Sequence, residues 1–234
     1  RETASALRIP LFRFSHQEGH AAAVMESDGK QPDMRVLLFH LSGGTTEALL
    51  CSPDEKGYSM QIAGGTKDIS VGQLLDRYGV ALGLPFPAGK YLDDTAYSCL
   101  ESTDFTVSAS DRTGIIPGLK LNDGFFNLSG AETRLLRYAA DPGGVPSEKV
   151  TAELFCALSE LLIKDALYLI DKYDAATVFM AGGVASSRTF REIADKGSCS
   201  NIRFGDPGLS GDNAVGTALL AKRIYETGKC ITGK

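Results

Sequence analysis

The chain has 234 residues, of which 43% are hydrophobic and 23% are charged, and its formal net charge is −5. This composition is typical of a folded protein with a substantial core, and it excludes a disordered chain. No run of lysine or arginine stands out, so the sequence shows no electrostatic footprint for tight unaided nucleic-acid binding, and no apolar run approaches the length of a membrane span. The five cysteines are widely spaced and form no CxxC pair, which predicts reduced thiols in a cytoplasmic protein.

The first chemically informative stretch holds two of the three histidines, His16 and His20, in front of a run of alanines. If this segment is helical, residues four apart share a face, so both imidazoles point at one place. A metal site and a pair of surface histidines fit this spacing equally well. The zinc-protease pattern HExxH is not present, because Glu18 stands two residues after His16 instead of one.

The third histidine, His40, falls within a predicted buried strand at residues 36–41, after a loop at residues 26–33. It is either a core histidine or part of a site, because the glycine turn Ser42-Gly43-Gly44-Thr45-Thr46 follows it at once. A second strand is predicted at residues 47–51, so this turn is expected to form a hairpin. The same glycines would let backbone N–H groups approach a phosphate, and the two interpretations are compatible.

Further elements follow in alternation. We expect a strand at residues 58–63, a helix at residues 70–82 carrying Asp76, a rigid elbow at residues 85–89, and a helix carrying Asp93 and Asp94. Taken alone, Asp76 would be a residue of a solvated helix face. The next predictions are an irregular stretch at 101–121, a strand end within 125–130 that feeds a helix through Tyr138, and a long core-facing helix capped by Ser147. After these we expect a strand at 176–181, a helix at 188–196, a strand at 202–204 and a helix at 214–225 capped by Asp212.

A second glycine pair, Gly182-Gly183, lies between a predicted strand and a predicted helix that starts after Ser187. Free N–H groups and the helix dipole at such a terminus favour an anion. Close packing of the helix on the strand explains the glycines equally well.

In this order, the motifs HxxxH, SGG, Gly-Gln-Leu-Leu-Asp, Pro-Ala-Gly, Ser-Gly before a helix, AGGV and Asp-Asn resemble the TsaD-like tRNA N6-adenosine threonylcarbamoyltransferase family, once described as O-sialoglycoprotein endopeptidases. The resemblance extends from about Ala4 to Ala221. It implies an α/β fold of the actin-like ATPase type, which sugar kinases, Hsp70 and actin share and which is RNase H-like, with the ligand between two related lobes.

Members of that family open with a strand and a Gly-Ile-Glu-Thr-Ser-Cys-Asp loop that have no counterpart in this sequence, so we expect a truncated chain with an incomplete first lobe. The expected division is a remnant of the first lobe with the metal-binding helix at residues 1–33, the second α/β lobe at 34–208, and a C-terminal helix that returns to the first lobe at 209–234.

The resemblance also implies ligands. One transition-metal ion, zinc or iron, would be held by His16, His20 and Asp212, with His40 at the place of a tyrosine that approaches the metal in archaeal and eukaryotic members. An adenine nucleotide, either ATP or threonylcarbamoyl-AMP, would contact Ser42, Gly43, Gly44, Thr45, Asp76, Gly89, Asp93, Gly182, Gly183 and Ser187.

The implied function is metal-dependent transfer of a threonylcarbamoyl group from threonylcarbamoyl-AMP to the N6 amine of an adenosine beside the tRNA anticodon. Partner subunits would supply much of the tRNA affinity, in a homodimer or a heterodimer with a related subunit. Thr45, Glu132 and Ser187 depart from the family pattern, and they motivate the alternative of a non-catalytic metal- and nucleotide-binding paralogue. A metallopeptidase is the second alternative. No single catalytic residue is predicted.

Overall fold

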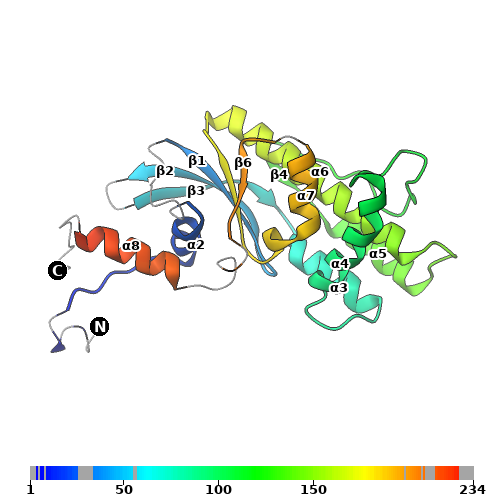
Figure 1. Ribbon diagram of the computed structural model, residues 1–234, viewed down its shortest axis with the longest axis horizontal. Coiled ribbons are helices and arrows are strands. Elements are labelled where there is room, and N and C mark those ends of the chain that lie inside the picture. Colours follow the sequence, from blue (N-terminus) through cyan, green and yellow to red (C-terminus); the bar gives the residue numbers. More distant parts are fainter. Residues whose placement is uncertain are drawn as a thin grey trace.

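The computed structural model of the protein describes residues 4, 6–7, 9–25, 34–54, 57–197, 199–206, 208 and 214–226. These residues form a central six-stranded sheet with the order β4-β3-β2-β1-β5-β6, and helices lie on both of its faces (Figure 1). The strands are β1 Val36–Leu41, β2 Thr46–Asp54, β3 Gly57–Thr66, β4 Phe125–Phe126, β5 Val178–Ala181 and β6 Ile202–Phe204. The helices are α2 His16–Met25, α3 Val71–Ala81, α4 Gly89–Leu100, α5 Ser129–Ala140, α6 Ser147–Tyr173, α7 Arg188–Lys196 and α8 Val215–Glu226, with 3₁₀ turns at Glu101–Thr103 and Val184–Ser186.

The sheet is mixed. Strands β1, β2 and β3 form an antiparallel meander, whereas β5 runs parallel to β1, β6 parallel to β5, and β4 parallel to β3. Strand β1 is buried along its whole length because both of its faces are covered. Because successive side chains of a strand point to opposite faces, Phe39 and Leu41 belong to one core, whereas Leu38 belongs to the core on the opposite face.

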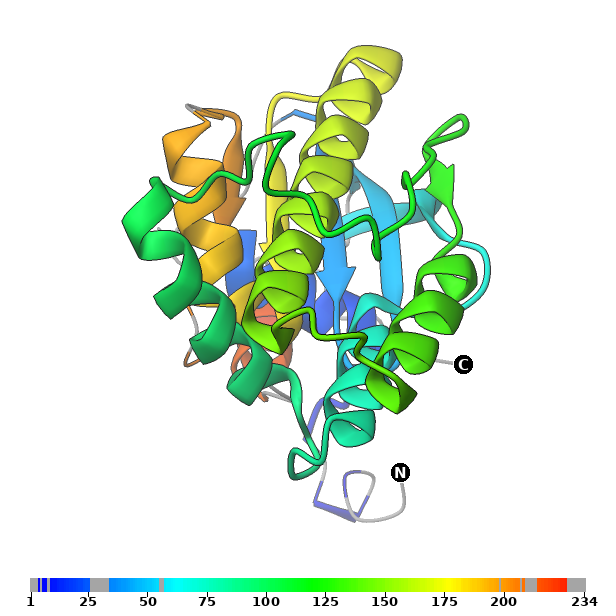
Figure 2. The same cartoon turned by 90° about the vertical axis from the view of Figure 1, so that its right-hand side faces the viewer.

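The larger core lies between the sheet and helices α3 to α7, which Figure 2 shows in front of the strands. Helix α6 crosses this face and contributes Leu154, Leu158 and Leu162 to the core. The smaller core lies on the opposite face, where Ala21 and Val24 of α2 pack against β1 and β2.

Helix α8 packs against α2 through two glycines. The contact is so close that a Cβ atom added to Gly216 would lie 1.8 Å from the carbonyl oxygen of Gly19. Only residues without a side chain allow the two backbones to approach in this way. The run of small residues after His20 is therefore packing surface, and its helix is held from both sides.

Most predicted elements are confirmed, although strands β2 and β3 extend beyond the predicted ends. The hairpin between β1 and β2 forms, and the stretch before β4 is irregular apart from the turn at Glu101–Thr103. The predicted cap at Ser147 is wrong, because Ser147 is already the first helical residue and makes no capping hydrogen bond. Pro146, whose φ is −66° and ψ 136°, supplies the last extended position before that helix.

Three further predictions have different outcomes. Asp212, the predicted cap of the last helix, lies outside the described residues. The division into lobes stays a prediction. In the part of the chain that the structure describes, no helix has the length and apolarity needed to cross a bilayer.

Candidate metal centre and adjoining pocket

Helix α2 and strand β1 bring all three histidines together. The Nε2 atoms of His16 and His20 are 3.0 Å apart, and one ring nitrogen from each of His16, His20 and His40 lies within 4.8 Å of the other two. His20 and His40 are buried, whereas His16 is exposed. Within the described part of the chain, solvent therefore reaches the cluster through His16.

This cluster has the donors and the dimensions of a transition-metal site. Zinc binds imidazole nitrogen at about 2.1 Å, so two nitrogens in a tetrahedral site lie about 3.4 Å apart. The spacing of the three rings requires only small side-chain rotations to reach that value. Imidazole suits zinc, iron and related ions, and the identity of the metal stays a prediction.

The start of α2 is fixed by a capping box. The backbone N–H of Glu18 donates to Ser15 Oγ at 3.2 Å, and the N–H of Ser15 donates to the carboxylate of Glu18 at 2.6 Å. The pattern Ser-x-x-Glu was present in the sequence and could have predicted this cap. Its consequence is that the Glu18 carboxylate turns back onto the helix N-terminus.

A second contact fastens α2 to the sheet beside the histidines. Gln17 Nε2 donates to Glu47 Oε2 at 3.2 Å, and Glu47 is the residue of β2 directly opposite His40. Sequence reasoning missed both residues, because only the register of β1 and β2 reveals that Glu47 faces His40.

A pocket of about 480 Å³ opens where the β1–β2 turn, the elbow before α4 and the start of α7 meet. It is lined by Gly43, Gly72, Leu75, Asp76, Pro87, Gly89, Lys90, Asp93, Asp94, Phe155, Gly183, Val184, Ser186, Ser187 and Arg188. The predicted nucleotide residues Gly43, Asp76, Gly89, Asp93, Gly183 and Ser187 are therefore brought together around one cavity. Ser42, Gly44 and Thr45 belong to the same turn as Gly43, and Gly182 directly precedes Gly183, but they are not among the lining residues.

The β1–β2 turn is held rigidly and keeps its glycines open. Ser42 N–H donates to the Thr45 carbonyl at 2.8 Å, and Ser70 Oγ donates to the Gly43 carbonyl at 2.8 Å. A Cβ at Gly43 or Gly44 would meet no atom within 4 Å, whereas one at Gly72 would lie 2.5 Å from Gly43 Cα. The N-terminus of α3 therefore presses on the turn from one side and leaves its other side free for a ligand.

Asp76 is more than a solvated helix residue. Its Oδ1 accepts hydrogen bonds from the backbone N–H groups of Ala88 at 2.8 Å and Gly89 at 3.2 Å, at the start of α4. The carboxylate thus sits at the positive end of that helix while it lines the pocket.

Asp93 occupies the N-terminus of α7, where an anion was one of two interpretations. Its carboxylate accepts hydrogen bonds from Ser187 Oγ at 2.6 Å, Arg188 N–H at 2.9 Å and Thr189 N–H at 3.1 Å. Ser187 in turn caps the helix by accepting from the N–H of Phe190. The anion that this helix terminus holds in the structure is a side chain of the chain itself.

Two cationic residues of the pocket, Lys90 and Arg188, were missed from the sequence. The Arg188 guanidinium lies 3.9 Å above the ring of Tyr97 and 3.8 Å from Asp94, which holds it at the pocket wall. Lys90 is the second residue of α4 and is exposed. Isolated basic residues at helix starts carry no sequence signal that distinguishes them from ordinary surface residues.

The histidine cluster and the pocket share the β1–β2 hairpin. His40 is the penultimate residue of β1, and the pocket-lining Gly43 follows within the turn. One short, rigid segment of the hairpin therefore connects the pocket to the histidine cluster.

Comparisons with known proteins identify related chains. The family model of TsaD, tRNA N6-adenosine threonylcarbamoyltransferase, matches residues 1–219. The threonylcarbamoyltransferase of Streptococcus thermophilus is 30% identical over 215 residues, which cover 91% of this chain and 60% of the relative. That of Streptococcus uberis is 31% identical over 223 residues, covering 94% and 63%. The chain thus spans about three fifths of the length of these relatives.

Solved structures show the fold. Full-length HypF in its phosphate- and nucleotide-bound form superposes with a TM-score of 0.68 at 14% identity, over 96% of this chain and 38% of HypF. The activator of 2-hydroxyisocaproyl-CoA dehydratase from Clostridium difficile, with bound ADPNP, gives 0.50 at 16% identity, over 93% and 70%. These similarities confirm the actin-like ATPase fold. The family model matches most of this chain, which identifies the chain as a member of the TsaD family, tRNA N6-adenosine threonylcarbamoyltransferase.

Proposed function

We propose that the protein transfers a threonylcarbamoyl group from threonylcarbamoyl-AMP to the N6 amine of an adenosine beside the tRNA anticodon. The amine attacks the carbamoyl carbonyl carbon, the bond from that carbon to the phosphate oxygen breaks, AMP departs with the electron pair, and the amine loses a proton to solvent. The proposal rests on family membership together with the geometry of the site.

One observation carries it: the β1–β2 hairpin contributes His40 to the histidine cluster and Gly43 to the lining of the pocket. A threonylcarbamoyl adenylate has an adenosine phosphate at one end and a carbonyl and carboxylate at the other. A donor with its phosphate at the Gly43 turn would extend its acyl end toward His40. His16, His20 and His40 would hold the metal ion, which would supply Lewis-acid polarisation of the carbonyl.

The chain's own residues would bind and orient the donor. The open side of the Gly43-Gly44 turn presents backbone N–H groups to the phosphate. Lys90 and Arg188 add positive charge at the pocket wall, and Asp76 offers an acceptor for ribose hydroxyl groups. Asp93 and Ser187 would act by positioning α7 instead of by touching the phosphate, because their polar groups are bonded to each other.

The proposed acceptor is tRNA. An adenosine in a loop is unstacked at little cost, which exposes its N6 amine to the carbonyl. With a net charge of −5, this chain would rely on partner subunits for much of the tRNA affinity. The proposed partner is a second copy of this chain, in a homodimer, or a related subunit, in a heterodimer. We also propose that α2 and α8 belong to the first lobe.

The test is product formation by the chain supplied with threonylcarbamoyl-AMP and tRNA, followed by mass spectrometry of the digested nucleosides. We expect the modified adenosine with the wild type, a loss of at least about a hundredfold in His20→Ala, and no change in Lys222→Ala on the exposed face of α8. A wild type that binds metal and AMP but forms no product would contradict the transfer and select the paralogue.

One observation bears on each alternative. Glu132, which departs from the family pattern, forms an ion pair at 2.7 Å with Arg77, the residue that follows Asp76 in the sequence. This local change of charge partners supports a paralogue with altered binding. The metallopeptidase is disfavoured, because Glu18, the carboxylate nearest in sequence to the two helix histidines, is engaged in the capping box.

A further inference from the structure

A second cavity lies on α6, away from the hairpin. Its volume is about 310 Å³, and it is enclosed between α6 and the irregular segment that precedes β4. None of its lining residues also lines the pocket at the hairpin. The proposed transfer reaction assigns this cavity no role.

The segment over the cavity is anchored by a buried carboxylate. Glu153 of α6 is 6% exposed and accepts hydrogen bonds from both the N–H and the hydroxyl of Thr113, the former at 2.8 Å. Thr113 Oγ1 also accepts from the N–H of Ile115 at 3.2 Å. Because charge-assisted hydrogen bonds are among the stronger ones, the cavity has a fixed wall.

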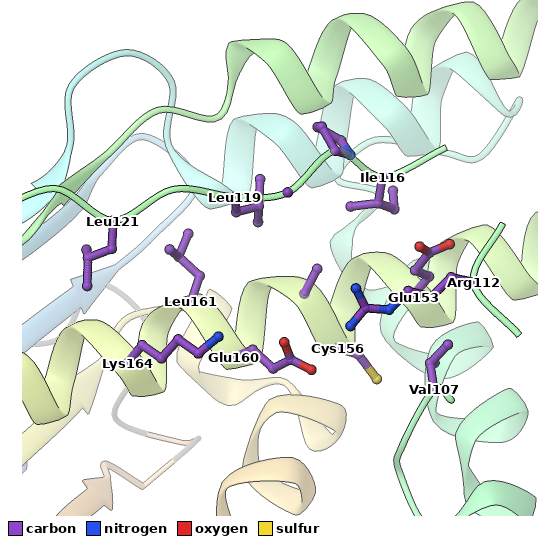
Figure 3. Close-up of a pocket in the computed structure, with 13 residues that line it drawn as sticks. Val107, Arg112, Ile116, Leu119, Leu121, Glu153, Cys156, Glu160, Leu161 and Lys164 are labelled. Carbon is purple, nitrogen blue, oxygen red and sulfur yellow. The ribbon is translucent and has the colours of Figure 1, made fainter. Parts of the chain in front are cut away.

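The cavity has an apolar side and a charged side (Figure 3). On the apolar side, Ile116, Leu119 and Leu121 of the segment line the cavity, and Leu161 points toward them from α6 (Figure 3). A small ligand with an apolar group could bury that group here and gain roughly 25 cal/mol for each Å² removed from water.

The charged side carries Arg112, Glu160 and Lys164, and Figure 3 shows them in a row with the carboxylate between the two cations. All three are exposed. Among the described residues, no salt bridge within 4.0 Å joins any of them to another charged side chain. The row therefore offers two positive poles and one negative pole to a ligand.

We propose that this cavity binds a free amino acid with an apolar side chain. Its carboxylate would bind Arg112, its ammonium group would bind the adjacent Glu160, and its side chain would occupy the apolar side. A simple carboxylic acid would leave Glu160 beside an anion, and a simple amine would leave Arg112 unmatched. A polar side chain would lose hydrogen bonds to water without replacement. The volume is at the lower end for ligand pockets, which favours a small ligand over a nucleotide or a peptide.

The test uses three probes that share the leucine side chain and differ in their charged groups: L-leucine, N-acetyl-leucine and leucinamide. Each is titrated into the full chain and followed by calorimetry or NMR. We expect leucine to bind most tightly, because each analogue lacks one pole. Arg112→Gln should weaken leucine and N-acetyl-leucine by about tenfold, and it should not weaken leucinamide, which loses only a like charge nearby. Glu160→Gln should weaken leucine and leucinamide by about tenfold, and it should not weaken N-acetyl-leucine, for the same reason.

A cavity-filling variant tests the location of the binding site, and a second variant on the same helix is its control. Ala157 lines the cavity, so Ala157→Leu should abolish leucine binding while it keeps AMP binding at the hairpin pocket. Leu167, exposed on the same helix and not a lining residue, can be changed to alanine without effect on leucine binding. No binding by the wild type, equal binding of all three probes, or leucine binding retained in a folded Ala157→Leu protein would overturn the proposal.

Discussion

The three histidines of the cluster differ in burial, and burial decides how much metal affinity should be lost when each is replaced. His20 and His40 are buried at 5% and 4% exposure, so their rings are held in place by packing, whereas His16 is exposed. A ligand held by packing loses little entropy when it binds a metal ion. The two buried histidines should therefore contribute most to metal affinity.

We predict that purified wild-type protein holds about one transition-metal ion per chain, and that His20→Ala and His40→Ala lose it. Elemental analysis after reconstitution measures this stoichiometry. Gln61→Ala, on the exposed side of β3, is the control and should retain the metal. Metal retained in both histidine variants would exclude this cluster. Asp212→Ala, at a residue outside the described part of the chain, tests the fourth predicted ligand in the same assay.

A buried carboxyl group should make the stability depend on pH. Asp165 of α6 is fully buried, neither carboxyl oxygen has a hydrogen-bond partner within the described residues, and burial raises the pKa of this group from 3.8 to about 7. The folded protein therefore holds the proton more tightly than the unfolded chain does. The contribution of Asp165 to stability is undiminished below pH 4 and falls as the pH rises from about 4 to 7.

We expect Asp165→Asn to remove this pH dependence. The pKa difference of about three corresponds to roughly 4 kcal/mol at pH 8, so the variant should gain up to about that much in free energy of unfolding there, and less at pH 4. Urea unfolding at several pH values measures the effect. An unchanged pH profile would show that Asp165 does not keep its proton in the folded state.

At the scale of elements, the contact between α2 and α8 positions the histidine helix. A Cβ at Gly216 would lie 1.8 Å from the Gly19 carbonyl oxygen, so α8 must move to accept any side chain. Since α2 carries His16 and His20, displacement of α8 should also disturb the metal centre.

Gly216→Ala should therefore lower the free energy of unfolding by about 1–3 kcal/mol and weaken metal binding together. The matched control is Gly130→Ala in α5, where a Cβ would meet no atom within 4 Å. That change should be neutral or slightly stabilising, because alanine favours the helix. Equal unfolding free energies for both variants would contradict the close helix contact.

Three helix N-termini in this fold are held by carboxylates from other elements. Carboxylates reach across the structure to hold N-termini, as Asp76 does for α4, Asp93 for α7 and Asp68 for α5. Partial burial raises the pKa of Asp68, but hydrogen bonds from the N–H groups of Leu128, Ser129 and Ile69 outweigh it and lower that pKa well below its usual range. Two of these three carboxylates, Asp76 and Asp93, also line the hairpin pocket, so the pocket walls are held by helix caps.

For the whole molecule, a nucleotide in the hairpin pocket should stabilise the fold, because the pocket walls come from separate elements. AMP at about a hundred times its dissociation constant should raise the free energy of unfolding by about 2.7 kcal/mol. Lys90→Glu should weaken AMP binding by about tenfold, whereas Lys222→Glu, the same charge change on α8, should not. Thermal unfolding with and without AMP measures both; equal AMP responses of the two variants would show that Lys90 does not contact the nucleotide.

Much of the site could be predicted from sequence because its motifs are local. Ser42 to Thr45 form the expected hairpin turn, and Ser187 caps the expected helix. The histidine spacing placed the rings of His16 and His20 on one helix face, and the structure brings both to His40. By contrast, Glu47, Lys90 and Arg188 were missed, because their importance depends on which distant elements they face.

The sequence by itself determined most of the elements and the family, because periodicity, turn chemistry and motif order depend on residues close together in the chain. Only the tertiary structure decided that Asp93 holds the start of α7, that Gly72 presses on the Gly43 turn, and that α8 covers α2. It also decided that a second cavity forms over α6, through the link from Glu153 to Thr113. The physical reason is that each of these contacts joins segments far apart in the chain, where packing of complementary surfaces, and not local preference, sets the partner.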